Sequence, residues 1–293
     1  MTAWAENKKI SRPSAILTAI WNEFIYGGHL ISLGPSSIAY IYMRVNNLTV
    51  SWQVLIGIYL ITYIVHLLDR YIDIQVDSST DRLEYYGKMK KVLPWILLSA
   101  TSFLIVLLAN NMAMVLFAAF LILAGASYTV FFKKLTRYIL GFKSYYTAAV
   151  FAMTVVFTAF FYRDFSLSPV LIAMYFFFFF RWFSNTVFCD LKDIEEDRKD
   201  SLKTFASHFK MRSLYVFLYV INIISMIIII VGVSTRELPV YTLALIAAPV
   251  YSFYYLMLSR KKDANYQKLA NVWADGESIV WLVAILIGGA IWA

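Results

Sequence analysis

Long apolar runs alternate with short polar and charged segments along the chain. A helix that crosses a bilayer needs roughly 20 mostly apolar residues, and many of these runs reach that length. A membrane-spanning β-strand would alternate apolar and polar positions, which residues 220–233 do not do. The pattern predicts an all-α polytopic membrane protein with about nine transmembrane helices, at residues 20–42, 51–68, 92–109, 112–132, 144–162, 167–189, 213–232, 238–259 and 276–292.

The composition supports this class of protein. Of the 293 residues 61% are hydrophobic, and the mean hydropathy is +0.67, whereas soluble domains contain about 45–50% apolar residues. We expect one domain spanning residues 1–293. The polar residues 1–14 are not followed by the short apolar core of a removable signal peptide. The single cysteine, Cys189, excludes an internal disulfide and a cysteine-based zinc site.

Basic residues gather in every second connection between the predicted helices. Of the 26 Lys and Arg residues, all but Arg44, Arg163 and Arg236 fall in the N-terminal segment, in those connections or, in the case of Arg181, in the helix that leads into one of them. Because basic loops stay in the cytoplasm, the N-terminus should be cytoplasmic and the C-terminus on the opposite side. The net charge of +8 is spread over several loops, which favours contact with anionic lipid over binding of nucleic acid.

Two of the predicted cytoplasmic loops, at residues 69–91 and 190–212, are long and rich in aspartate. In the first loop Asp69, Asp73 and Asp77 follow one another at intervals of four residues. Such residues share one face of a helix. Stacked carboxylates repel each other, and a divalent cation would remove that repulsion.

The second loop carries a similar cluster, with Asp190, Asp193 and Asp197 at intervals of three and four residues. Both clusters follow the cytoplasmic ends of predicted helices, so they should face each other at one depth. A single cluster of this kind could consist of solvated loop residues without a function. Two clusters at the same depth and on the same side of the membrane favour a functional site. Carboxylate oxygens suit Mg²⁺ bound together with substrate phosphate. Nearby basic residues could neutralise the remaining phosphate charge: Arg82, Lys133, Lys134, Lys143, Arg198 and Lys199.

The two clusters resemble the signature motifs of the UbiA superfamily of intramembrane prenyltransferases. Asp69, Asp73 and Asp77 match its Asn-x-x-x-Asp-x-x-x-Asp motif, and the second cluster matches Asp-x-x-Asp-x-x-x-Asp. Supporting similarity comes from Arg12-Pro13, Tyr128, Lys133-Lys134, Gly141-Phe142-Lys143, Arg198 and Lys203-Thr204.

This resemblance implies nine helices around a central cavity capped by the cytoplasmic loops. The six aspartates would act as catalytic residues that hold two Mg²⁺ ions and, through them, an isoprenyl diphosphate. The implied reaction is ionisation of the allylic diphosphate and capture of the carbocation by a small aromatic or lipid acceptor. The prenyl tail would lie in the apolar cavity.

The chain also departs from the family pattern at three places. Asp69 replaces the Asn of the first motif, and Glu196 replaces the Gly that usually precedes the last Asp of the second. The segment after the first motif reads Asp81-Arg82-Leu83-Glu84 and lacks an Arg-Pro run. Despite these departures we still expect the diphosphate chemistry, but they leave the identity of the acceptor open.

Further candidates are single polar residues near these motifs. Glu23 and His29 are ionisable residues within the first predicted span, where such groups are functional candidates for acceptor binding. The alternative is an interfacial Glu23 and a His29 hydrogen-bonded to a neighbouring helix. His66 precedes Asp69 by about one turn and is a candidate to orient a carboxylate or contact phosphate, with a hydrogen-bonded interfacial histidine as the alternative. Tyr71, Tyr128 and Asn185 are candidates to line the pocket.

We expect mainly structural roles for two other groups of residues. The aromatic run of residues 175–180 is followed by Trp182 and Phe183, and aromatic faces of this kind can stabilise a carbocation. The run has no helical spacing, so most of it should face lipid or pack between helices. Asp263, Asp275 and Glu277 should lie in a solvated loop and at a helix start.

Three other functions were weighed against prenyl transfer. Terpene cyclisation on the same scaffold, without an external acceptor, stays open. A cation transporter would place carboxylates near the bilayer midplane rather than at one face. Transfer of phosphoryl alcohols from CDP-alcohols would require an Asp-Gly-x-x-Ala-Arg motif, and neither cluster carries that glycine pattern.

Overall fold

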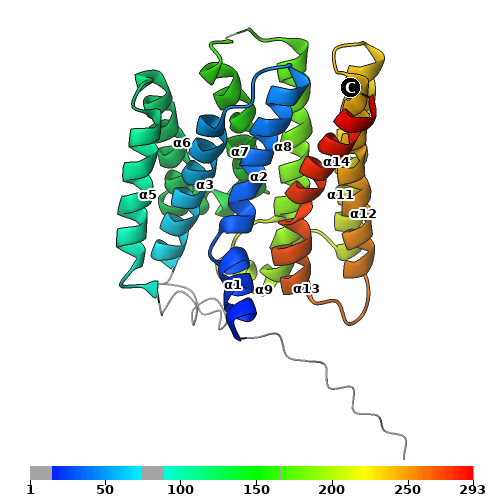
Figure 1. The fold of residues 1–293 in the computed structure, drawn as a ribbon. Coiled ribbons are helices and arrows are strands. Elements are labelled where there is room, and N and C mark those ends of the chain that lie inside the picture. Colours follow the sequence, from blue (N-terminus) through cyan, green and yellow to red (C-terminus); the bar gives the residue numbers. More distant parts are fainter. Residues whose placement is uncertain (1–14, 74–88, 165, 293) are drawn as a thin grey trace, which may run out of the picture.

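The computed structural model describes residues 15–73, 89–164 and 166–292, which fold into a bundle of helices running alternately up and down (Figure 1). The main helices are α1 (Ala15–Tyr26), α2 (His29–Val45), α3 (Trp52–Asp73), α5 (Leu93–Leu108), α6 (Met112–Val130), α7 (Phe142–Phe161), α8 (Pro169–Cys189), α11 (Met211–Ser234), α12 (Ala247–Ser259) and α14 (Glu277–Trp292). Shorter elements are η1 (Phe132–Arg137), η2 (Asp190–Lys192), α9 (Ile194–Lys199), α10 (Phe205–His208), η3 (Val240–Ile246), α13 (Tyr266–Lys268) and η4 (Leu269–Ala274).

Six of the described helical segments are long and apolar enough to cross a membrane. They are Trp52–Ile72, Phe142–Phe161, Pro169–Lys192, Met211–Ser234, Val240–Ser259 and Tyr266–Trp292. Leu93–Leu108 and Met112–Tyr128 are shorter apolar helices. Large apolar side chains such as Trp95 and Val106 are exposed on the bundle surface, as expected of a protein solvated by lipid. The chain is therefore an integral membrane protein.

The first predicted span, residues 20–42, is not one continuous helix. It is divided between α1 and α2 at Gly27-Gly28, where Gly28 has a φ of +87°. A Cβ at Gly28 would lie 2.2 Å from Cδ2 of His66 on α3. Glycine is needed here both for the left-handed backbone and for the close approach of α3. Hydropathy alone did not reveal this break, because apolar residues continue on both sides of it.

Two buried apolar clusters hold the bundle together. The larger joins α2, α7, α8, α11, α12 and α14, and its core includes Phe177, Trp182 and Trp281. The smaller joins α2, α3, α5, α6 and α7, and includes Ile58 and Phe157. Helices α2 and α7 contribute to both clusters, so they connect the two halves of the bundle.

A backbone link fixes the segments around the second aspartate cluster. The N–H of Gly141 donates to the carbonyl of Lys203 over 2.8 Å, and the N–H of Lys203 donates to the carbonyl of Thr136 over 2.8 Å. Gly141 has a φ of +68°, and a Cβ there would lie 2.0 Å from the Phe205 ring. The link holds the start of α7, where Lys143 lies, beside the segment that follows α9.

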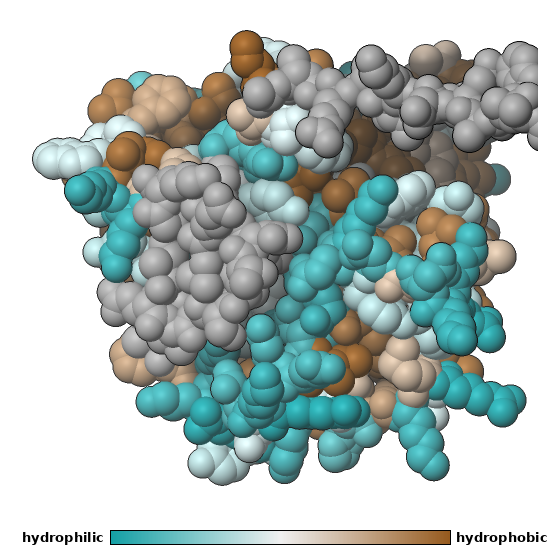
Figure 2. All heavy atoms as spheres, turned by 90° about the horizontal axis from the view of Figure 1, so that it is seen from below, coloured by the Kyte–Doolittle hydropathy of each residue, from teal (hydrophilic) through white to brown (hydrophobic). Residues whose placement is uncertain are grey.

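The two ends of the bundle differ in charge. The exposed residues Arg198, Lys199, Asp200, Lys261 and Lys262 belong to segments at the end where α9 and α13 lie. Figure 2 views the molecule from this end and shows hydrophilic side chains gathered over much of the surface that is not grey. Connections at the other end hold the exposed Arg44, Arg163 and Arg236. The segregation of charge follows the sequence pattern, and the orientation in the membrane stays a prediction.

Candidate active site

A cavity of about 520 Å³ lies among α3, α6, α7 and α8, and its other walls come from α1, α2, η2, α9 and the C-terminal η4 segment. Acidic and basic side chains line one end of it, and apolar and aromatic side chains line the rest. Most of the predicted site residues meet here: His66, Asp69, Tyr128, Lys133, Lys143, Asn185, Asp190, Asp193, Asp197 and Lys199.

Several other predicted site residues are not in this lining. Asp77 and Arg82 lie outside the described residues. Asp73 is the last residue of α3, and its side chain is likewise outside the description. Arg198 is exposed on α9 and does not line the cavity. The first motif is therefore represented in the described cavity by Asp69 alone.

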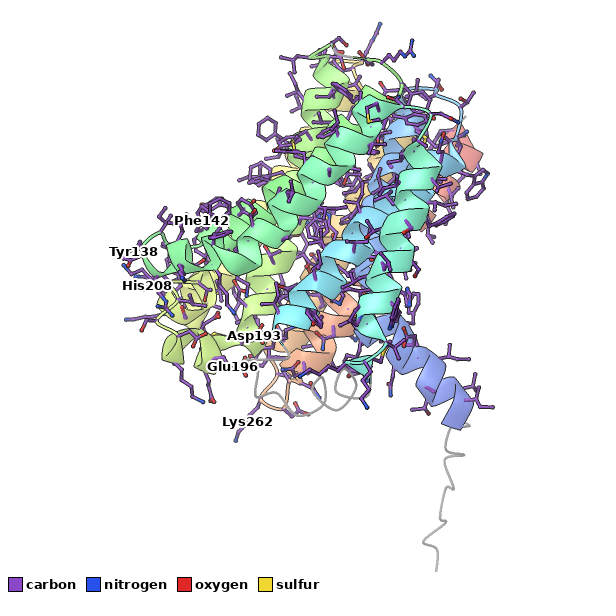
Figure 3. The ribbon with its side chains drawn as sticks, turned by 90° about the vertical axis from the view of Figure 1, so that its left-hand side faces the viewer. Tyr138, Phe142, Asp193, Glu196, His208 and Lys262 are labelled. Atoms are coloured by element: carbon purple, nitrogen blue, oxygen red, sulfur yellow. The ribbon has the colours of Figure 1, made fainter. Side chains whose placement is uncertain are left out.

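The spacing of the second aspartate cluster predicts that its three residues share one continuous helix, but in the structure they do not lie on one helix. Helix α8 ends at Cys189, a 3₁₀ turn carries Asp190, and α9 begins after Asp193, whose carbonyl accepts from the N–H of Asp197 over 2.8 Å. In Figure 3, Asp193 and Glu196 lie at the same end of the bundle as Lys262. The cluster therefore follows two short turns at the charged end, and Glu196 joins the cavity lining.

Asp190 is 1% exposed and forms an ion pair with Lys143, whose Nζ lies 2.7 Å from its Oδ1. The hydroxyl of Ser144 donates to Oδ2 of Asp190 over 3.3 Å. An unpaired carboxylate would be costly at such a depth, so the lysine compensates the buried charge. Both residues had been predicted to contact metal or phosphate separately, whereas here they contact each other.

Asp197 is 4% exposed, and its Oδ2 accepts a hydrogen bond of 2.9 Å from the hydroxyl of Thr204. Burial raises the pKa of Asp197 to about 6, an effect that Lys143 opposes and that the neighbouring Asp190 and Asp193 reinforce. The raised pKa therefore reflects mainly the cost of desolvating the buried carboxylate.

Aromatic and apolar residues form the deeper walls of the cavity. Trp182 is 2% exposed and stacks on Phe151, with ring centroids 4.0 Å apart and ring planes inclined by 9°. Thr154, Ile58 and Leu121 line the cavity further from the charged end. Trp182 belongs to the aromatic group noted in the sequence, whereas Phe151, Thr154, Ile58 and Leu121 were not predicted to line a site. The helical spacing of Lys143, Thr147, Val150 and Thr154 could have indicated the stripe on α7.

The family model described as the UbiA prenyltransferase family matches residues 31–274. The chain belongs to the UbiA prenyltransferase family. The structure of digeranylgeranylglyceryl phosphate synthase is similar to this chain, with a TM-score of 0.56 and 17% identity over 92% of this chain and 98% of that one. The apo structure of a UbiA homolog from Aeropyrum pernix K1 is also similar, with a TM-score of 0.65 and 12% identity over 89% and 96%. At these identities the likeness shows a shared fold. No curated protein matches the chain significantly.

The C-terminal part of this UbiA-family protein contributes a wall that the sequence analysis had placed in solvent. Asn271 and Asp275 line the cavity at a turn of π-helix, a local form that is frequent at functional sites. The ammonium of Lys192 donates to Oδ1 of Asn271 over 2.7 Å, and the thiol of Cys189 lies 3.9 Å from Oδ1 of Asp275. The expectation that Asp275 belongs to a solvated loop was wrong.

Glu277 is the first residue of α14, as expected, but it is not solvated. This carboxylate is 1% exposed, and its Oε1 lies 2.6 Å from Nη2 of Arg181 on α8, which is fully buried. The indole N–H of Trp281 donates to it over 2.8 Å. Glu277 therefore joins α14 to α8 inside the bundle, away from the cavity lining.

Glu23 and His29, the two ionisable residues of the first predicted span, lie on either side of the glycine break. His29 is hydrogen-bonded to the hydroxyl of Tyr59, and its Nε2 lies 3.3 Å from Oε1 of Glu23. Its ring also stacks on Tyr63, with ring centroids 5.1 Å apart. Neither Glu23 nor His29 lines the described cavity. The hydrogen-bonded alternative for His29 agrees with this geometry.

Among the described residues no group of three metal-binding side chains is assembled. The donor types around the charged end are nonetheless those that Mg²⁺ prefers, because Asp69, Asp193, Glu196 and Asp197 offer carboxylate oxygens. These residues, with Asp73 and Asp77 of the first motif, are the ones that would hold Mg²⁺.

Proposed function

We propose that this protein is a Mg²⁺-dependent prenyltransferase that moves an isoprenyl group from an allylic isoprenyl diphosphate to a small aromatic or lipid acceptor. The cavity carries this proposal, because it joins a charged end to an apolar interior within one enclosure. An isoprenyl diphosphate has the same division between a charged head and an apolar tail. Membership of the UbiA family and likeness to a prenyltransferase structure support the same reaction class.

The charged end supplies groups suited to a diphosphate. Lys133, Lys192 and Lys199 line it beside the carboxylates, so cations and metal ligands occur together. Bound Mg²⁺ would neutralise the departing diphosphate and so favour breaking of the allylic carbon–oxygen bond. The lysine ammonium groups would stabilise the same developing charge by electrostatic attraction.

The apolar interior suits the prenyl tail and its carbocation. Tyr146, Phe151 and Trp182 line the cavity, and aromatic faces attract a cation through their quadrupole. The surrounding apolar residues keep water away from the cation, so that an acceptor bound beside it can capture it. Loss of a proton from the acceptor then completes the transfer.

The test uses protein purified in lipid nanodiscs and a series of allylic diphosphates of ten, fifteen and twenty carbons. Diphosphate release and product mass are measured with and without Mg²⁺ and with and without candidate aromatic and lipid acceptors. Asp193→Ala should abolish turnover. Asp263→Ala, in an exposed loop, is the matched control and should leave turnover unchanged.

Each outcome of this test has a clear reading. A Mg²⁺-dependent product that needs an acceptor and is lost in Asp193→Ala would support prenyl transfer. A cyclic product formed without an acceptor would favour the terpene cyclase. Turnover unaffected by Asp193→Ala would refute the role of the second aspartate cluster.

A further inference from the structure

The cavity ends abruptly within the bundle, although the helices that line it continue. On α7 the lining residues Lys143, Thr147, Val150 and Thr154 follow one face at helical spacing. The next residue of that stripe is Phe157, which is fully buried and does not line the cavity. The lining on α7 therefore ends at Thr154, one turn before a large buried side chain.

The cavity lining on the neighbouring helices ends at the same level. On α3 the lining extends to Ile58, and the next residue of that face, Val54, is fully buried. On α6 the lining extends to Leu121, followed on its face by Ala118 and Met114, which are 2% and 0% exposed. Val54, Ala118, Met114 and Phe157 belong to one buried cluster that also contains Ile58 and Leu121.

Phe157 is the bulkiest member of this far wall. Its ring packs against Phe117 of α6, with centroids 5.4 Å apart. Phe117 in turn packs edge-on against Phe160, with centroids 5.6 Å apart. Side chains in such a packed cluster move little, so the wall is a fixed end to the cavity.

The length of the cavity follows from the helix that carries the first motif. Asp69 and Ile58 both line it and are eleven positions apart on α3, which corresponds to about 16 Å at 1.5 Å per residue. Each isoprenoid unit adds four carbon–carbon bonds of about 1.5 Å, or about 5 Å of extended chain. About three units therefore fit between the charged end and the far wall.

We propose that Phe157 sets the length of the prenyl donor and that the protein selects a fifteen-carbon allylic diphosphate over a twenty-carbon one. This inference rests on the proposed function, because it assumes that the diphosphate lies at the charged end. A fourth isoprenoid unit would have to displace the packed Phe157 ring or fold back into space that the acceptor needs.

Binding, measured without turnover, tests this selection directly. Geranyl, farnesyl and geranylgeranyl S-thiolodiphosphates are titrated calorimetrically into the protein in nanodiscs with Mg²⁺. Affinity should rise by about tenfold or more from ten to fifteen carbons, because the added unit buries apolar surface. It should fall again at twenty carbons, because the fourth unit would have to displace the packed Phe157 ring.

Two variants, one that should lengthen the cavity and one that should shorten it, test the role of the wall. Phe157→Ala should raise the affinity for the twenty-carbon compound relative to the fifteen-carbon one by about tenfold. Thr154→Leu adds bulk inside the cavity and should reverse the preference towards the ten-carbon compound, and it does not depend on tolerance of a hole at residue 157. Phe177→Ala removes an equally buried ring from the other cluster and should leave the order unchanged.

The results separate this inference from the proposed function. Mg²⁺-dependent binding that is equally tight at fifteen and twenty carbons, and unchanged in order by both variants, would overturn the role of Phe157 while leaving the diphosphate site intact. Absence of Mg²⁺-dependent binding at every chain length would overturn the diphosphate site and the length selection together.

Discussion

Removal of the Glu277 carboxylate should destabilise the bundle strongly, because it leaves Arg181 as a buried charge without its counter-ion. Nε and Nη2 of Arg181 lie 2.8 Å and 2.6 Å from Oε1 of Glu277. The hydroxyls of Ser252 and Tyr255 donate to the other oxygen over 3.0 Å and 3.1 Å. Glu277→Ala would remove all of these acceptor interactions at once.

The magnitude follows from the burial of both partners, which are 0% and 1% exposed. Loss of one partner of a buried ion pair costs about 3–5 kcal/mol, because the remaining charge stays desolvated. For a chain of this size that cost corresponds to a decrease of roughly 10 °C in apparent melting temperature. Replacing both partners, as in Arg181→Met with Glu277→Ala, removes the orphaned charge and should restore at least half of the loss.

The assay is thermal unfolding in detergent, followed by the loss of monodisperse protein in size-exclusion chromatography. Glu237→Ala, which alters an exposed glutamate, is the control for loss of a carboxylate and should leave the melting temperature unchanged. The reasoning is refuted if Glu277→Ala melts like the parent. It is also refuted if the double variant is less stable than Glu277→Ala, because the arginine charge would then not be the source of the cost.

Three further predictions concern the site and the glycine break. Asp197→Asn should stabilise the metal-free protein at pH 8 by up to about 3 kcal/mol. Folding raises the pKa of the Asp197 carboxyl from its ordinary value of 3.8 to about 6, so the charged carboxylate destabilises the folded state. Thermal unfolding should show this advantage in full above pH 6 and lose it as the pH falls below 4, whereas protection of the same variant by Mg²⁺ and substrate analogue should be weaker. Lys143→Met should cost about 3 kcal/mol of stability by orphaning Asp190, and equal melting temperatures for parent and variant would contradict that pairing. Gly28→Ala should lower the melting temperature through about 1–2 kcal/mol of backbone strain and a clash with His66, and Gly57→Ala, whose added Cβ would lie 3.6 Å from its nearest neighbour, should not.

The class of fold could be read from the sequence because the bilayer imposes a one-dimensional rule. Any segment that crosses it needs about 20 apolar residues, so run length alone located most of the helices. The same rule could not detect the break at Gly28, which depends on the backbone conformation and on the proximity of His66. It also could not say that the predicted span 238–259 begins with the 3₁₀ segment η3, or that a π-helical turn precedes α14. Those features depend on how helices meet.

The site shows the same division between local pattern and tertiary contact. The spacing of the second motif placed Asp190, Asp193 and Asp197 at one cavity, but the charge balance among them depends on Lys143, nearly fifty residues earlier in the chain. Asp275 and Glu277 look alike in sequence, two residues apart near a helix start. In the structure one lines the cavity and the other neutralises Arg181 inside the bundle. Two residues on a helix are separated by about 200° around its axis, so neighbouring carboxylates there face different partners.

The same geometry explains why the far wall of the cavity was missed. Phe157 is one of several aromatics in a helix that is apolar on all sides, and no local pattern distinguishes the ring that closes a cavity from one that faces lipid. Its role emerges only when the lining residues of α3, α6 and α7 are found to stop at one level. The proposed selection of chain length would therefore be a property of packing. It would change through one buried substitution while both aspartate motifs, and with them the proposed diphosphate chemistry, stay the same.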